Sequence, residues 1–152
     1  MKKAFLLTFL LAVFAPQLAT AQATNKTDGP RFNHAALCVQ DLKKSVEFYR
    51  DALQLAEIAN PFNDGAHAWF SIGPALQLHI IQRGCAPVTA KDTHLCFSVG
   101  SLASFIAHLE KRNVAYTNLK GDSRTPTTRA DGVKQIYLQD PDGYWIEIND
   151  AK

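Results

Sequence analysis

Two histidines and a glutamate have the types and positions that suit a divalent-metal site. His34 and His94 each stand near the start of an apolar segment, five residues before a valine. Glu147 lies inside the apolar run from Tyr144 to Ile148, where an inward-facing carboxylate is costly unless it is paired or bound to a metal. Neutral imidazole is a common ligand for zinc, iron, nickel and copper. These three residues therefore predict a metal centre, with Glu147 as the candidate catalytic residue.

A fourth ligand is expected from the segment 76–81. Its residues Gln77 and His79 are two apart and share one face of an extended strand. Imidazole is the stronger donor, which favours His79. Gln77 stays open as the alternative, because the sequence does not decide the register between the two halves of the chain.

Such a centre supports two kinds of chemistry. Fe(II) with three protein ligands keeps open positions for oxygen and substrate, whereas a Lewis-acid metal polarises a carbonyl or stabilises an enediolate. With a fourth ligand and waters, zinc, nickel, cobalt or manganese is equally reasonable. The plainer interpretation is structural: a lone strand histidine usually binds no ligand, and Glu147 could face solvent on a one-sided sheet.

The elements that must position these residues occur twice in the chain. A short β-type run, 33–39 or 93–99, ends in each half at a good helix N-cap, Asp41 or Ser101. The two candidate histidines occupy the same place in the two runs. A two-fold relation between the halves would bring equivalent positions towards a common axis.

Each opening run is followed by a helix and further strands. Apolar residues at helical spacing predict helices over 42–53 and 102–109. Strand-like runs follow at 66–72, 76–81, 134–139 and 144–148. The sequence Asp140-Pro-Asp-Gly143 predicts a tight turn before the last strand, and residues 84–92 form a linker. We therefore expect one domain of two βαβββ-like halves.

The first 21 residues have the pattern of a secretory signal peptide. Lys2 and Lys3 precede an uncharged apolar run, and Ala19-Thr-Ala21 supplies the small residues of a cleavage site. The apolar run is shorter than the roughly 20 residues of an ordinary membrane span. We expect cleavage after residue 21 and a flexible leader over 22–30. The mature protein would be periplasmic or secreted, without stable membrane association.

The charge balance argues against nucleic acid as a partner. The chain has 16 Lys and Arg against 14 Asp and Glu, and loss of Lys2 and Lys3 lowers the 16 to 14. A mature chain without net charge has no global electrostatic attraction to nucleic acid or to an anionic membrane. The sequence also lacks a G-x-S-x-G elbow, a phosphate-binding glycine loop and a C-x-x-C pair, so serine hydrolase, nucleotide-binding and thiol-redox functions have no support.

The long polar segment 118–132 carries Lys120, Arg124 and Arg129. Loops of this length are often functional, and these cations could hold an anionic substrate. A plain solvated loop is the simpler interpretation.

Three cysteines are too few for a disulfide scaffold. Cys38 and Cys96 lie on predicted strands near the candidate histidines, and Cys85 lies in the linker. One pair could bridge in an oxidising compartment, but we expect buried free thiols, since cysteine is often simply a small core residue.

At these residues the chain resembles the vicinal oxygen chelate superfamily, which includes glyoxalase I, fosfomycin-resistance proteins, methylmalonyl-CoA epimerase and extradiol dioxygenases. The matching stretches are Phe32–Leu42, Thr93–Val99 and, as the most specific motif, Asp140–Ile148. The resemblance covers about residues 31–150, with module one at about 31–83 and module two at about 93–150.

The resemblance implies an α+β fold in which two βαβββ modules form a half-open mixed-sheet barrel around a metal. It also implies a homodimer, often with modules exchanged between the two chains. Carried onto this sequence, the ligands are His34, His94 and Glu147, with the fourth position at His79 or Gln77. The cofactor would be a divalent ion such as zinc, nickel, iron, manganese or cobalt.

We therefore expect an exported, metal-dependent, glyoxalase-like enzyme that activates a small oxygenated substrate, by lyase or isomerase chemistry or by ring-cleaving dioxygenation. The alternative is a non-catalytic protein that sequesters a small molecule, as bleomycin-resistance proteins do. Glyoxalase I has a glutathione-holding arginine four residues after its first histidine, where this chain has Cys38. The resemblance is therefore not extended to lactoylglutathione as the substrate.

Overall fold

The computed structural model describes residues 29–86 and 90–152. The expected signal peptide, residues 1–21, lies outside these residues, as does most of the leader, so both stay predictions. Residues Phe32–Lys152 form one unit by their internal contacts. Among the described residues, no helix is long and apolar enough to cross a membrane.

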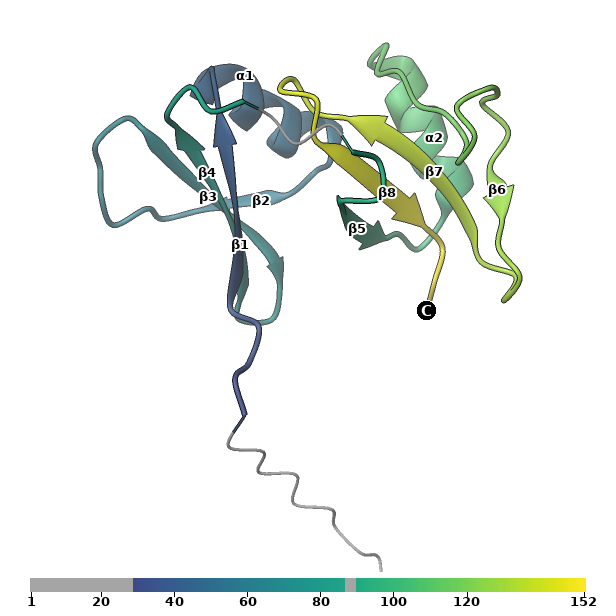
Figure 1. Cartoon of the computed structure of the whole chain (residues 1–152), viewed down its shortest axis with the longest axis horizontal. Coiled ribbons are helices and arrows are strands. Elements are labelled where there is room, and N and C mark those ends of the chain that lie inside the picture. The colour runs from purple at the N-terminus through teal and green to yellow at the C-terminus, as the bar shows by residue number, and fades with distance from the viewer. Residues whose placement is uncertain (1–28, 87–89) are drawn as a thin grey trace, which may run out of the picture. The chain divides into compact units, whose positions relative to one another are not determined.

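The first half of this unit builds one four-stranded mixed sheet. Its elements in chain order are β1 (His34–Val39), α1 (Leu42–Glu47), the π-helical segment η1 (Phe48–Ala52), β2 (Ala56–Ile58), β3 (His67–Gly73) and β4 (Leu76–Gln82). The strand order is β1-β4-β3-β2 (Figure 1). Strand β1 runs parallel to β4, and the other two pairs are antiparallel.

The second half repeats this plan. Its elements are β5 (His94–Ser98), α2 (Leu102–Lys111), β6 (Thr127–Thr128), β7 (Lys134–Gln139) and β8 (Trp145–Asn149). The strand order is β5-β8-β7-β6, with the same parallel and antiparallel pairs as in the first sheet. The expectation of two βαβββ modules is therefore confirmed.

Both helices begin at the predicted caps. The Asp41 side chain accepts a hydrogen bond from the backbone N–H of Lys44, and the Ser101 side chain accepts one from the N–H of Ser104. These bonds satisfy amide groups that a helix start leaves without a partner. The first helix differs from the prediction in its second half, where it widens into η1 instead of remaining α-helical.

One apolar core packs the helical regions against one face of each sheet. Phe70, Leu78 and Ile80 from the first sheet and Ile146 and Ile148 from the second are all at most 1% exposed. Successive side chains of a strand point to opposite faces. The neighbours of these core residues on β4 and β8 are therefore directed to the other face, where the candidate ligands lie.

The turn Asp140–Gly143 is built as predicted. The Asp140 carboxylate accepts hydrogen bonds from the backbone N–H groups of Asp142 and Tyr144, and Gly143 has a φ of 89° that a residue with a side chain rarely adopts. The other Asp140 oxygen accepts a buried 2.8 Å hydrogen bond from the Tyr49 hydroxyl. The turn before β8 is thus fastened to the first helical region.

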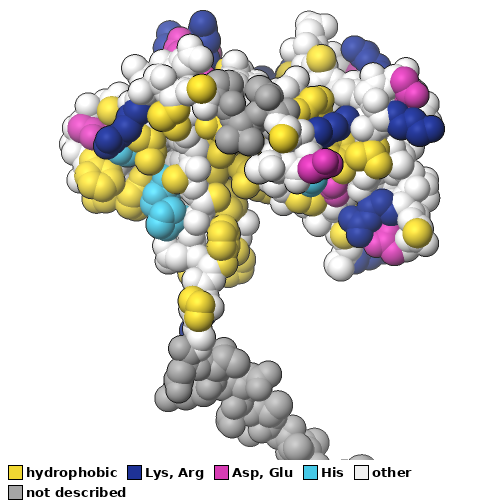
Figure 2. Space-filling model, viewed as in Figure 1, with side chains coloured by type: hydrophobic (Ala, Val, Ile, Leu, Met, Phe, Trp, Pro, Cys, Tyr) yellow, Lys and Arg dark blue, Asp and Glu magenta, His cyan; other side chains and the backbone are white. Residues whose placement is uncertain are grey.

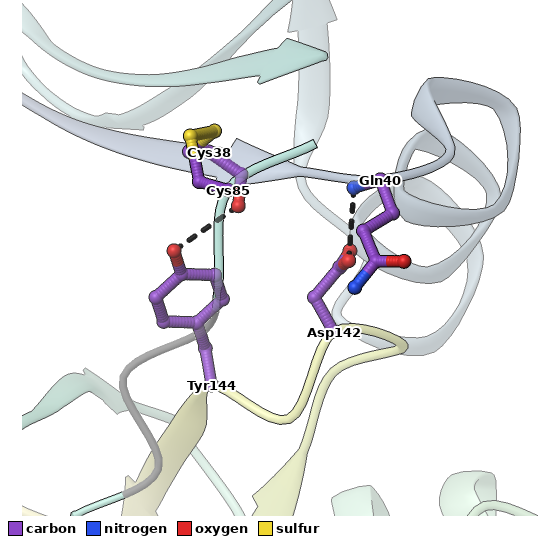
Figure 3. The surroundings of a disulfide bond; sticks show 5 residues. All are labelled: Cys38, Gln40, Cys85, Asp142 and Tyr144. Atoms are coloured by element: carbon purple, nitrogen blue, oxygen red, sulfur yellow. Dashed lines mark hydrogen bonds between the residues drawn. A yellow bond between two sulfur atoms is a disulfide. The ribbon is translucent and has the colours of Figure 1, made fainter. Parts of the chain in front are cut away.

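Two further contacts join this turn to the end of β1. The Asp142 carboxylate accepts hydrogen bonds from the backbone N–H of Gln40 at 2.9 Å and from the Ser45 hydroxyl at 3.1 Å. The Tyr144 hydroxyl donates to the carbonyl oxygen of Cys38 at 3.0 Å (Figure 3). The two modules are therefore joined by polar bonds beside the strand that carries Glu147.

Cys38 and Cys85 form a disulfide, with their Cα atoms 5.7 Å apart (Figure 3). The expectation of free thiols is wrong for this pair. The chain leaving β4 stays beside the end of β1, where the backbone N–H of Gly84 donates to the carbonyl of Val39, and this brings Cys85 within bonding distance. Cys96 is free, as expected, but it is exposed and not buried.

Candidate metal centre

His94 and Glu147 lie side by side on the face of the second sheet that is opposite the core. Strand β5 runs parallel to β8 and places Cys96, the next residue on the His94 face, opposite Glu147. The His94 Nε2 atom is 3.4 Å from Glu147 Oε2. The Glu147 residue is only 5% exposed, so the solvent-facing alternative for this carboxylate is wrong.

The hydrogen bonds of His94 indicate which of its two ring nitrogens carries the proton and which has a free lone pair. Its Nδ1 lies 2.7 Å from the carbonyl oxygen of Lys91, and because a carbonyl only accepts, Nδ1 must carry the proton. In the neutral ring, Nε2 therefore presents its lone pair to Glu147 Oε2. A cation, either a proton or a metal ion, would be attracted by both of these electron-rich atoms.

Glu147 is held by three donors on its own sheet. The Tyr137 hydroxyl donates to Oε2 at 2.6 Å, while the Asn149 amide and the Cys96 thiol donate to Oε1 at 2.8 and 3.4 Å. Burial alone would raise the pKa of Glu147, but these bonds and the nearby His94 together lower it below its usual value. The carboxylate is thus kept ionised, which a metal ligand requires.

The neighbours of Glu147 are kept protonated by the same contacts. Burial, reinforced by the carboxylate, raises the pKa of Cys96 to about 11 and raises the pKa of Tyr137 well above its usual value. A protonated thiol is a poor nucleophile. Cys96 and Tyr137 therefore act in this site as hydrogen-bond donors to Glu147.

His34 and His79 lie together on the face of the first sheet that is opposite the core. Their rings are stacked, with centroids 4.3 Å apart and planes at 12°, and the other face of His79 stacks on Trp69 at 4.0 Å and 3°. His34 Nδ1 lies 2.8 Å from the Asn33 side-chain oxygen, so its Nε2 is the unprotonated nitrogen of the neutral ring. His79 Nε2 lies 2.9 Å from Gln77 Oε1, which leaves Nδ1 in that role.

The strand register makes His79, and not Gln77, the counterpart of Glu147. In the first sheet His34 pairs with Gln77 and Ala36 pairs with His79. In the second sheet His94 pairs with Trp145 and Cys96 pairs with Glu147. In each sheet the first histidine pairs with a residue of the neighbouring strand. Two residues beyond that partner lies His79 in the first sheet and Glu147 in the second.

The structure brings the candidate ligands together in pairs, one pair in each module. The described residues contain no group of three or more His, Cys, Asp or Glu side chains placed to hold a metal ion. A single metal ion nevertheless fits the second pair, because two ligands bound at about 2.0–2.2 Å can lie up to about 4.4 Å apart. Each module therefore presents one pair of candidate ligands.

Cations border the second pair. Arg129, from the polar segment 118–132, has Nη1 3.8 Å from Glu147 Oε1 and also contacts Asp131. Lys91 lies over the rings of Tyr137 and Trp145 at 4.7 and 4.6 Å. Burial lowers the pKa of Lys91.

Two site residues were not identified from the sequence, namely Tyr137 and Trp69. Both stand on predicted strands. The alternation of side chains along such a strand is the signal that could have placed them on the same face as the candidate ligands.

A cavity of about 350 Å³ also opens beside His94, with Leu37 and Tyr144 in its lining. Figure 2 shows exposed histidine side chains next to hydrophobic ones on the surface of the first module.

Comparisons with known proteins identify the family and the fold. Residues 31–148 match the Glyoxalase/Bleomycin resistance protein/Dioxygenase superfamily. Lactoylglutathione lyase of Pseudomonas putida is 26% identical over 162 residues, covering 85% of this chain and 90% of that protein. Metallothiol transferase FosB of Staphylococcus epidermidis is 28% identical over 123 residues, covering 77% and 79%.

A solved structure shares the fold. The crystal structure of a putative glyoxalase family protein from Bacillus anthracis aligns with a TM-score of 0.65 at 21% identity, covering 81% of this chain and 96% of that one. The repeated βαβββ plan and the superfamily match over residues 31–148 lead to one conclusion: the chain belongs to the Glyoxalase/Bleomycin resistance protein/Dioxygenase superfamily.

Proposed function

We propose that this protein is a metal-dependent enzyme that acts on a small oxygenated organic molecule. Its metal ligands would be His34, His79, His94 and Glu147. The observation that carries the proposal is the buried, ionised Glu147 whose Oε2 faces the lone pair of His94 Nε2 at 3.4 Å. Members of the superfamily use divalent metals, and relatives such as lactoylglutathione lyase are enzymes.

We further propose that the complete site forms between two copies of the chain. His34 and His79 of one copy would meet His94 and Glu147 of the other, so that a homodimer holds two equivalent sites. The distribution of ligand pairs over the two modules supports this, as does the fact that superfamily members typically act as dimers. Closing the site within a single chain is the alternative outcome of the test below.

A bound divalent metal would chelate adjacent substrate oxygens and stabilise negative charge that develops on them. The chain's own residues would do the rest. Tyr137 and Asn149 hold the Glu147 carboxylate in place, and Arg129 adds positive charge 3.8 Å from it. Glu147 is also our candidate for a group that moves a proton in a lyase or isomerase reaction. The cavity beside His94 leaves room for a small molecule.

Metal analysis of the purified protein tests the ligands. We expect the native protein to bind one cobalt ion per chain, and the double variants His34→Ala/His79→Ala and His94→Ala/Glu147→Ala to bind none. Native-like metal content in both variants would overturn the ligand set. Tight binding of a small molecule without any metal would instead support a sequestering protein.

Mixing the two double variants tests the shared site. After unfolding and refolding together, a mixed dimer would contain one complete site and one site without ligands, so cobalt binding should recover to one ion per mixed dimer. Each variant refolded alone is the control. If the mixture binds no cobalt while the native protein does, the site lies within one chain.

We also propose that the protein is exported and works in the periplasm or outside the cell. The apolar segment and cleavage pattern at residues 1–21 support this, and so does the Cys38–Cys85 disulfide, because disulfides persist mainly in oxidising compartments. Sequencing the N-terminus of the natural protein should give Gln22 as its first residue. A start at Met1 would contradict cleavage.

A further inference from the structure

The third strand of each module places one aromatic residue directly opposite the candidate ligand. On β3, Trp69 pairs with His79, and on β7, Tyr137 pairs with Glu147. Since His79 and Glu147 are themselves equivalent in register, Trp69 and Tyr137 occupy the same position in the repeated unit. The two modules thus present a ligand and a third-strand partner in the same arrangement.

Each partner contacts its ligand in the way that suits the ligand's chemistry. Tyr137 offers an O–H group, which donates to the Glu147 carboxylate at 2.6 Å. Trp69 offers a ring face, which lies on the His79 imidazole at 4.0 Å with the planes only 3° apart. The Trp69 N–H is buried and has no hydrogen-bond partner among the described residues, so its contact with His79 is through the ring.

We propose that Trp69 and Tyr137 are the positioning residues of the two half-sites, and that the residue at each of these positions selects the kind of ligand beside it. An indole face orients an imidazole, and a phenol hydroxyl orients a carboxylate. This inference rests on the proposed function, because it takes His79 and Glu147 as metal ligands.

The stack explains how an indole can orient His79 without a hydrogen bond. The imidazole lies flat on the Trp69 indole, so any rotation of the ring out of the shared plane loses this contact. Stacked aromatic pairs are favourable beyond the area that they bury. Gln77 then fixes the remaining freedom by accepting from one ring nitrogen at 2.9 Å. The lone pair of the other ring nitrogen of His79 then points in one fixed direction.

Exchanging the pair gives the sharpest test. His79→Glu places a carboxylate against the ring face of Trp69, which offers it no donor, and should weaken cobalt binding about 10–100-fold, the usual cost of a lost outer-shell partner. The double variant Trp69→Tyr/His79→Glu recreates the Tyr137–Glu147 pair of the other module and should recover most of that loss. A double variant that binds cobalt no more tightly than His79→Glu overturns the selection of ligands.

Single substitutions separate positioning from general packing. Trp69→Phe keeps a ring face and should retain cobalt affinity within a few-fold, whereas Trp69→Leu should lose about 10–100-fold. Tyr137→Phe should lose as much, and Tyr116→Phe, whose hydroxyl bonds Glu110 elsewhere in the same module, is its matched control. Equal affinities of the phenylalanine and leucine variants at position 69 would show that Trp69 only fills space.

Trp69 fluorescence gives a readout that does not depend on activity. The chain has 2 tryptophans, so a Trp145→Phe background leaves Trp69 as the sole emitter. Cobalt added to this variant should quench the emission with the same midpoint as cobalt binding measured by dialysis, and adding His79→Ala should remove the quenching. Cobalt binding without any change in Trp69 emission would overturn the contact between Trp69 and a ligand.

The two levels of the proposal fail in different ways. If the native protein binds no divalent metal, the proposed function and this inference are both wrong. If the native protein binds metal but neither the pair exchange nor the fluorescence responds as described, only the positioning roles of Trp69 and Tyr137 are wrong.

Discussion

His79 and Glu147 occupy the same register position in the two sheets. Each lies two residues beyond the residue that pairs with the first histidine of its module, and each is on the face of its sheet opposite the core. This relationship is absent for Gln77, which pairs with His34 directly. A ligand set that respects the internal repeat therefore includes His79.

Substitutions at positions 77 and 79 should distinguish a metal ligand from a residue that only orients that ligand. We expect His79→Ala to weaken cobalt binding by more than about 100-fold, because a direct ligand is lost. Gln77→Ala should cost only about tenfold, as an outer-shell partner does, since it removes the acceptor that holds His79 Nε2. Equilibrium dialysis of both variants measures the two affinities. The reverse order would make Gln77 the ligand.

Removing the Tyr49 hydroxyl should destabilise the protein. Tyr49→Phe leaves a buried Asp140 oxygen without its 2.8 Å hydrogen bond, and an unsatisfied buried polar group costs about 1–3 kcal/mol. Urea denaturation followed by circular dichroism measures the free energy of unfolding. The control is Tyr116→Phe, whose partner Glu110 is exposed and can be rehydrated. Equal losses in the two variants would contradict a special role for the Tyr49–Asp140 bond.

The stability of the protein should depend on pH through Asp140. Burial raises the pKa of this carboxyl above its usual 3.8, despite the opposing hydrogen bond from Tyr49. The native state therefore holds this proton more tightly than the unfolded state, and the resulting stabilisation is lost as the pH rises from 3.8 through the raised pKa. In Asp140→Asn this dependence is absent.

Denaturation of the two proteins across pH measures that difference. The unfolding free energy of the native protein should fall relative to that of Asp140→Asn as the pH rises above 3.8, the usual pKa of this carboxyl. Asn can still accept the two backbone bonds of the turn, so the variant should fold. A difference that does not change with pH, or that changes in the opposite direction, would contradict the raised pKa of Asp140.

The thiols of the protein can be counted directly. Of 3 cysteines, Cys38 and Cys85 are joined, so a thiol reagent under non-reducing denaturing conditions should find one thiol per chain, and three after reduction. Cys38→Ser/Cys85→Ser should lower the unfolding free energy by about 2–4 kcal/mol, while Cys96→Ser serves as the control. Three thiols before reduction would disprove the bridge.

Local sequence signals predicted most of the fold. The caps at Asp41 and Ser101 and the strand over 134–139 agree with the structure because they depend on neighbouring residues only. Strands β2 and β6 were not located, since runs of three and two residues are too short to show alternation. The widening of the first helix at η1 likewise has no periodic signature.

The candidate site was predictable as a set of residue types but not as a geometry. His34, His94 and Glu147 could be placed on strand faces from the sequence, whereas the choice between Gln77 and His79 needed the pairing of β1 with β4. The distribution of the ligands into two pairs depends on contacts between distant segments. Local patterns carry no information on such contacts.

The Cys38–Cys85 bridge closes a sequence separation of 47 residues and lies N-terminal to every strand of the second module. When a chain crosses a membrane with its N-terminus first, both of these sulfurs reach the far side before any strand of the second module. The first sheet can therefore be locked covalently while the second is still being delivered. If the protein is exported as proposed, the later-arriving turn at Asp140 would dock onto a β1 end that the disulfide already holds.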